Sequence, residues 1–168
     1  MSEPLALLLL PSRLEQFEFP AHARSLLSIP RVVALEPGWL RTPRLLRQSA
    51  PVRAARKLRL PGEPRVIVLY HPQQYPLARA LCARYPEAEL WYVRPAPTAL
   101  DAGDASPELR DLDLLAAERA GEDHMGEQGP DLSELEERLR DRLRELEVIS
   151  ARPFVPGARV QGFRDRGL

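Results

Sequence analysis

The chain has 168 residues with 24 basic and 24 acidic side chains, so its formal net charge is zero. This length allows one domain with an ordinary core, because 44% of the residues are hydrophobic. The single cysteine, Cys82, excludes an intramolecular disulfide and favours a reducing, cytoplasmic location. The apolar run Leu5–Leu10 is too short to span a bilayer and lacks the basic flank of a signal peptide.

The first sixty residues predict two strands and a set of short helices. Leu5–Leu10 and Arg31–Leu35 are apolar runs that end at a proline or a Pro-Gly pair, as strands do. Glu15–Leu27 predicts a weak helix between them. Pro43–Leu60 predicts two short helices or one kinked helix, because Pro51 divides it.

The clearest strand and helix follow in direct succession. Val66–Tyr70 is a continuous apolar run and predicts a buried strand, and Pro76–Tyr85 predicts a short helix with proline in its first turn. One face of this helix carries its larger apolar side chains, Leu77, Ala78, Leu81, Cys82 and Tyr85. Glu89–Val93, which contains Trp91, predicts another strand.

The acidic second half predicts two helices. Ser106-Pro107 is a good helix start for a segment that runs to Ala120. Asp131 and Glu134 have capping-box spacing for a helix to Leu146, which carries a stripe of leucines expected to face the core. Val148-Ile149 predicts a last short strand, and Gly121–Gly129 a polar loop.

Strands that alternate with helices favour an α/β fold. We predict a three-layer Rossmann-like domain with a mainly parallel sheet of about four to five strands. The domain is expected to occupy residues 1–150, and residues 151–168 to form a C-terminal tail that packs on the domain or extends from it.

The turn between the clearest strand and the clearest helix is the candidate ligand site. Ligands of parallel α/β sheets bind at the carboxyl ends of the strands, and a helix N-terminus favours anions. Side chains able to hold a phosphate, a carboxylate or sugar hydroxyls follow the strand here: His71, Gln73, Gln74 and Tyr75. The alternative interpretation is a polar turn in which His71 bonds its own loop.

Several kinds of site are missing from the sequence. The turn contains no glycine, and the glycine motifs of dinucleotide and P-loop sites do not occur. His22, His71, His124 and Cys82 lack metal-ligand spacing, and no recognisable nucleophile motif is present. We therefore predict no cofactor and no metal, and we assign no catalytic residue.

One segment is strongly basic. Arg41–Arg59 carries seven cations and no acid: Arg41, Arg44, Arg47, Arg53, Arg56, Lys57 and Arg59. Such a segment can contact nucleic acid, an anionic membrane or a phosphorylated ligand, but a solvated helix face is the simpler explanation. The acidic second half offers another partner for it, within the fold or across a homodimer.

The residues around the candidate site resemble a known family. Leu69–Leu81 and Ala88–Tyr92 are similar to the strand, "HP-x-Q-YPLARAL" turn-helix and "AELWY" strand of glycosyltransferases with the GT-B fold. The resemblance covers Val66–Arg94 and implies the N-terminal, acceptor-side domain of such an enzyme. It places His71 and Tyr75 in the cleft and suits peripheral membrane contact through a basic helix. It also implies that a second domain holds the nucleotide-sugar donor, and 168 residues leave no room for one.

Three hypotheses follow from these observations. The first is a glycosyltransferase-N-domain-like protein that binds a sugar, a nucleotide or a phosphorylated ligand beside His71 and is not catalytically complete alone. The second is an interaction module that uses the basic segment and the acidic half to bind a protein partner, nucleic acid or membrane. The third is a small enzyme that uses His71 as a general acid or base.

Overall fold

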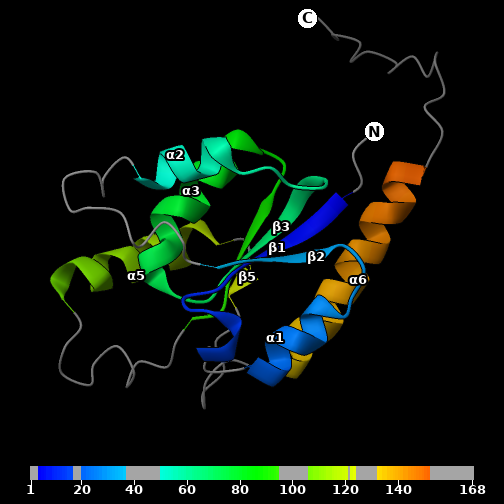
Figure 1. The fold of residues 1–168 in the computed structure, drawn as a ribbon, viewed down its shortest axis with the longest axis horizontal. Helices are drawn as coiled ribbons and strands as arrows, with labels where there is room; N and C mark the ends of the chain where they lie inside the picture. The colour runs from blue at the N-terminus through cyan, green and yellow to red at the C-terminus, as the bar shows by residue number, and fades with distance from the viewer. Residues whose placement is uncertain are drawn as a thin grey trace, which may run out of the picture.

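A computed structural model describes residues 4–16, 20–36, 50–94, 106–120, 122–123 and 132–151. Its centre is a sheet of five parallel strands in the order β2-β1-β3-β4-β5 (Figure 1). The strands are β1 (Pro4–Leu9), β2 (Val32–Leu35), β3 (Glu63–Leu69), β4 (Glu89–Tyr92) and β5 (Glu122–Asp123). This is a doubly wound order, whose direction reverses between β1 and β3.

Helices cover both faces of the sheet, which confirms the predicted three-layer α/β architecture (Figure 1). One layer contains α1 (Pro20–Leu27) and α6 (Leu132–Ala151). The other contains α2 (Ala50–Lys57), α3 (Tyr75–Arg84) and α5 (Pro107–Arg119). Two short 3-10 turns, η1 (Leu14–Gln16) and η4 (Pro72–Gln74), follow β1 and β3 at the carboxyl edge of the sheet.

The core has two halves because successive strand residues point to opposite faces. In β1, Ala6 and Leu8 pack toward α1 and α6, whereas Leu7 and Leu9 pack toward the other layer. All four side chains are fully buried, as expected for a parallel strand covered on both faces. The leucine stripe of α6 joins the first half through Leu132, Leu135, Leu139, Leu143 and Leu146.

Local sequence signals locate most of the elements correctly. The Ser106 hydroxyl caps α5 by accepting a hydrogen bond from the Leu109 backbone N–H at 3.3 Å. The predicted apolar face of α3 packs in the core, and Trp91 is 3% exposed. Pro51 is the second residue of α2, a position that proline tolerates. The first part of the predicted helical segment, residues 43–49, lies outside the described residues.

Two predictions near the end of the chain need correction. Val148-Ile149 is not a strand, because α6 continues through both residues to Ala151. No glycine or proline interrupts the sequence between Leu132 and Ala151, so nothing ends the helix earlier. The last strand is instead β5, which pairs with β4 inside the segment predicted to be a polar loop.

Among the residues described, no helix has both the length and the apolar character needed to cross a membrane.

Candidate functional site

The candidate site lies at the carboxyl ends of β1 and β3. The chain leaves β1 toward β2 on one side and later enters β3 on the other side. In doubly wound sheets this divergence opens a crevice in which ligands bind. Here Leu10 follows β1, and Tyr70 and His71 follow β3.

Gln74 is buried at this point of the sheet. Its side chain is 1% exposed, and its amide nitrogen donates a hydrogen bond to the Leu10 carbonyl oxygen, which joins the ends of the two strands. The amide oxygen of Gln74 has no hydrogen-bond partner among the described residues. The Leu10 carbonyl needs a donor, so this orientation of the amide is the favourable one. A buried polar atom without a partner is costly, and a ligand hydroxyl could satisfy it.

His71 is held in one tautomer by its own turn. Its Nδ1 accepts a hydrogen bond from the Gln73 backbone N–H at 3.2 Å, so the proton of the neutral ring resides on Nε2. Burial lowers the pKa of His71 from 6.5, which keeps the ring neutral near pH 7. His71 thus offers one N–H donor from a half-buried position.

The helix start at this turn offers few free donors for a phosphate. The N–H of Gln73 is bonded to His71 Nδ1, that of Gln74 to the His71 carbonyl at 3.0 Å, and that of Tyr75 to the Pro72 carbonyl. Pro72 and Pro76 have no N–H at all. Anion binding at a helix N-terminus depends on unpaired N–H groups, so this turn favours a neutral polar ligand.

The structure separates the four residues predicted to bind a ligand. His71 and Gln74 lie at the carboxyl ends of β1 and β3, and the Gln73 side chain is exposed at the surface. Tyr75 is 6% exposed and packs in the core between the sheet and α3. Only His71 and Gln74 therefore form the candidate site. The resemblance implied that Tyr75 lies in the cleft, whereas the structure buries the Tyr75 side chain inside the domain.

A buried charged group beside β4 is absent from the sequence predictions. The Asp113 carboxylate of α5 is 5% exposed and accepts a hydrogen bond from the Tyr92 hydroxyl at 2.7 Å. It also binds Arg94, with Nη2 at 2.7 Å and Nε at 3.1 Å from Oδ2. The sequence holds one signal for this group, because Asp113 interrupts the inward face of α5 between Leu112 and Ala116.

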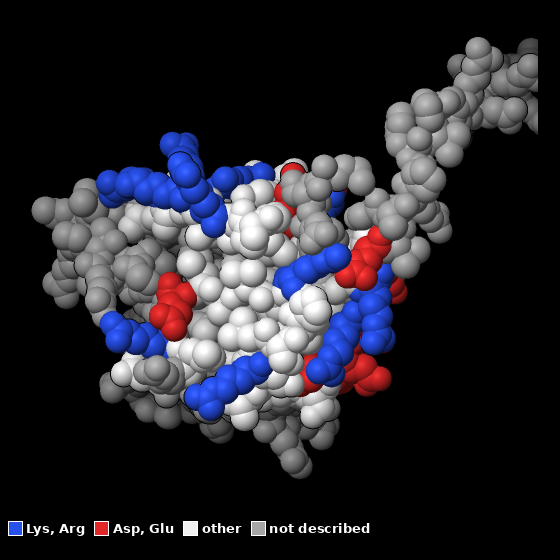
Figure 2. Space-filling model, turned by 45° about the vertical axis from the view of Figure 1, so that its right-hand side comes forward, with Lys and Arg blue, Asp and Glu red and all other residues white. Residues whose placement is uncertain are grey.

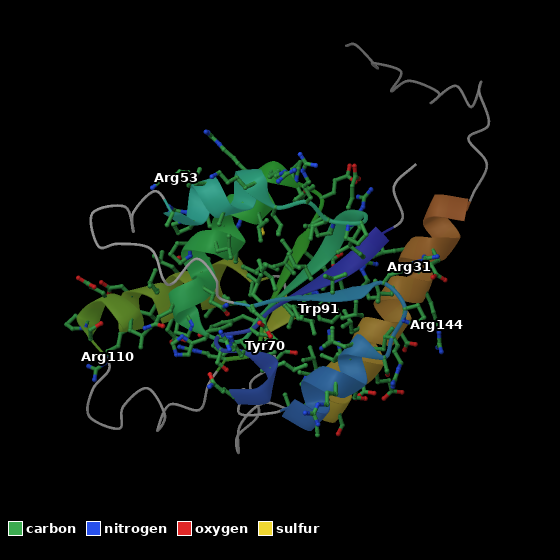
Figure 3. All side chains as sticks on the ribbon, viewed as in Figure 1. Arg31, Arg53, Tyr70, Trp91, Arg110 and Arg144 are labelled. Atoms are coloured by element: carbon green, nitrogen blue, oxygen red, sulfur yellow. The ribbon has the colours of Figure 1, made fainter. Side chains whose placement is uncertain are left out.

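A second polar contact lies on the other side of the sheet. His22 of α1 places Nε2 3.2 Å from the Tyr70 hydroxyl, and the two rings meet edge to face. Burial lowers the pKa of His22 and raises that of Tyr70. Figure 3 labels Tyr70 and Trp91, which belong to the core between the sheet and the α1 and α6 layer. His22 and Tyr70 are both neutral near pH 7. Their contact is therefore a hydrogen bond between neutral side chains, and it connects α1 to the end of β3.

The predicted basic segment is described only in its second half. Arg41, Arg44 and Arg47 lie outside the described residues, whereas Arg53, Arg56, Lys57 and Arg59 are exposed on α2 or just after it. Figure 2 shows blue side chains along the edge of the molecule where Figure 1 places α2. Arg84 of α3 holds the end of this helix, because its guanidinium donates to the carbonyls of Ala55, Arg56 and Leu58.

In the part of the chain described, no three His, Cys, Asp or Glu side chains gather where they could bind a metal ion. Comparison with protein-family models, with characterised proteins and with solved structures gives no match. The function must therefore be argued from the geometry of the site.

Proposed function

We propose that this domain binds a small hydroxylated ligand, a sugar or the ribose of a nucleoside, at the carboxyl ends of β1 and β3. Gln74 carries the proposal, because it is a buried side chain with an unpaired amide oxygen at the topological switch point of the sheet. His71, three residues earlier in the same turn, has one N–H donor. The ligand must first displace the surface that now covers the Gln74 oxygen.

Hydroxyl groups suit this pair of side chains. A sugar hydroxyl donates one hydrogen bond and accepts others, so one hydroxyl can donate to Gln74 Oε1 while its neighbour accepts from His71 Nε2. Each such bond contributes about 1 kcal/mol, and the bond to Gln74 also removes the penalty of its unpaired oxygen, about 1–3 kcal/mol. A phosphate gains less here, because the nearby backbone donors are already bonded.

The resemblance at Val66–Arg94 agrees with a sugar or nucleotide ligand. Under this proposal the domain corresponds to the acceptor-side domain of a GT-B glycosyltransferase. Glycosyl transfer would then need a donor-binding domain or subunit in addition to the single sheet described here. The proposed activity of this domain alone is therefore binding, without turnover.

The test is a thermal-shift series with hexoses, nucleosides and their phosphorylated forms. A ligand that binds only the folded protein raises Tm with concentration, by an amount set by its Kd. We expect a shift with a neutral sugar or nucleoside, and the phosphorylated form should add little. His71→Ala and Gln74→Met should each reduce the shift.

A matched variant and a second measurement keep this test decisive. Glu63→Gln changes a side chain at the opposite end of β3 and should leave the shift unchanged. If Gln74→Met lowers the Tm of the free protein, calorimetric titration at a temperature where it is folded measures binding directly. The proposal is refuted if no compound binds, or if His71→Ala and Gln74→Met both bind as tightly as the wild type.

A further inference from the structure

The layer formed by α2, α3 and α5 carries all the large hydrophobic side chains that are exposed among the described residues. Val52 of α2 is 44% exposed, and Leu114 and Leu115 of α5 are 61% and 45% exposed. The leucines of α1 and α6 instead join the core: Leu26, Leu27, Leu132, Leu135, Leu139, Leu143 and Leu146. Apolar residues gathered on one side of a domain mark an interaction surface more often than scattered ones do.

A groove between α2 and α3 contains the first of these residues. It has a volume of ≈ 580 Å³ and is lined by Val52, Ala80 and Ala83 together with Pro76 and Ala55. Three exposed arginines, Arg56, Arg79 and Arg84, line the same groove. The groove therefore combines an apolar floor with a positive rim, and it fits an apolar side chain flanked by carboxylates.

The outer face of α5 has the complementary composition. Asp111 precedes Leu114 and Leu115 by three and four residues, and Glu118 follows them by four and three. Residues at these separations lie on one helix face, so the two leucines are flanked by a carboxylate toward each helix end. Both carboxylates are exposed. These two carboxylates are opposite in charge to the arginines of the groove, and exposed Arg110 and Arg119 stand at the edges of the same helix face.

The opposite layer shows what a solvated surface of this protein looks like. On α6, oppositely charged side chains three or four residues apart pair with each other: Glu134 with Arg138, Glu136 with Arg140, Asp141 with Arg144 and Arg142 with Glu145. Figure 2 shows red and blue side chains mixed over this helix. On α5, the exposed positions 114 and 115 carry leucines instead of charged side chains.

We propose that this chain forms a two-fold symmetric homodimer in which Leu114 and Leu115 of each copy enter the α2–α3 groove of the other. In that arrangement Asp111 and Glu118 face Arg56 and Arg79. Helix α3 packs against both α2 and α5 and lies between them in the layer. A two-fold axis that runs parallel to α3, in the plane of contact between the two copies, brings α5 of each copy to the side of its partner that carries α2 and the groove, so both contacts form at once.

Charge exchange tests this pairing. One variant carries Arg56→Glu and Arg79→Glu, and a second carries Asp111→Arg and Glu118→Arg. In a homodimer of either variant like charges meet in both contacts, whereas a mixture of the two variants pairs opposite charges in both. We expect wild-type chains of 19.0 kDa to dimerise in sedimentation equilibrium. Each variant alone should dissociate about 100-fold more readily, and the mixture should recover the dimer.

The control is a pair of charge reversals on the other layer. Arg24→Glu and Arg144→Glu change two exposed arginines of α1 and α6 and should leave the dimer intact. A wild-type protein that stays monomeric up to about 1 mM overturns the proposal. It is also overturned if the wild type dimerises but the groove and α5 variants dimerise equally well, because another face is then responsible. A monomer that binds an unrelated acidic helix through the groove would assign this surface to a different partner and reject the homodimer.

Discussion

Replacing Asp113 should reveal how strongly one buried carboxylate holds β4 to α5. In Asp113→Asn the amide oxygen still accepts from the Tyr92 hydroxyl, but the negative charge that faces Arg94 is lost. In Asp113→Ala, Tyr92 and Arg94 both lose the carboxylate that accepts their hydrogen bonds. Tyr92 is fully buried, so its hydroxyl has no access to water as a substitute.

The structure sets the size of each effect. Arg94 donates to Asp113 through Nε and Nη2, and its side chain remains 25% exposed, so water compensates part of the lost attraction. We expect Asp113→Asn to lower the free energy of unfolding by about 2 kcal/mol. Asp113→Ala also removes the acceptor of the Tyr92 hydroxyl and leaves a small cavity, for a total loss of about 4 kcal/mol.

Urea unfolding followed by tryptophan fluorescence measures both losses, since Trp91 is buried in the same sheet. Glu137→Gln is the control, because it removes an exposed carboxylate from α6, outside the proposed dimer contact, and should change stability by less than about 0.5 kcal/mol. A double-mutant cycle with Arg94→Met should give a coupling of about 1–2 kcal/mol. The reasoning fails if Asp113→Asn costs no more than Glu137→Gln, or if the cycle shows no coupling.

Three further outcomes follow from groups elsewhere in the domain. Burial lowers the pKa values of His22 and His71, so the unfolded chain binds more protons below pH 6.5. The free energy of unfolding should therefore fall as pH drops from 6.5 through the lowered values, and melting curves of a His22→Gln/His71→Gln variant should show a flatter pH dependence. Arg84→Met removes the donor to the last carbonyls of α2 and should cost about 1 kcal/mol in urea unfolding, whereas an unchanged midpoint would deny it this capping role. Burial raises the pKa of the Cys82 thiol, so an aromatic disulfide reagent should modify it far more slowly in the native protein than in urea, and equal rates would contradict its burial.

The sequence by itself determined the fold class and most element positions, because these depend on short-range signals. The apolar run Val66–Tyr70 and the helix start at Ser106-Pro107 depend only on nearby residues, and both appear in the structure as predicted. The leucines of α6 also follow a local period, so their burial could be predicted. For the same reason, the sequence alone predicted that the candidate turn directly follows the carboxyl end of a strand.

Strand order and the character of the site were decided only by the tertiary structure. Gln74 contacts Leu10 across 64 residues, and Tyr92 contacts Asp113 across 21 residues. Neither pair falls within the short stretch of sequence from which a helix or a strand is predicted. Strand β5 is two polar residues long and has no periodic signal, and it exists because β4 offers it an open edge. Similarly, Val148-Ile149 has strand propensity but stays helical because α6 meets no break before it. Periodicity reports which face of an element is buried, whereas the partner of each buried polar group depends on how distant segments come together.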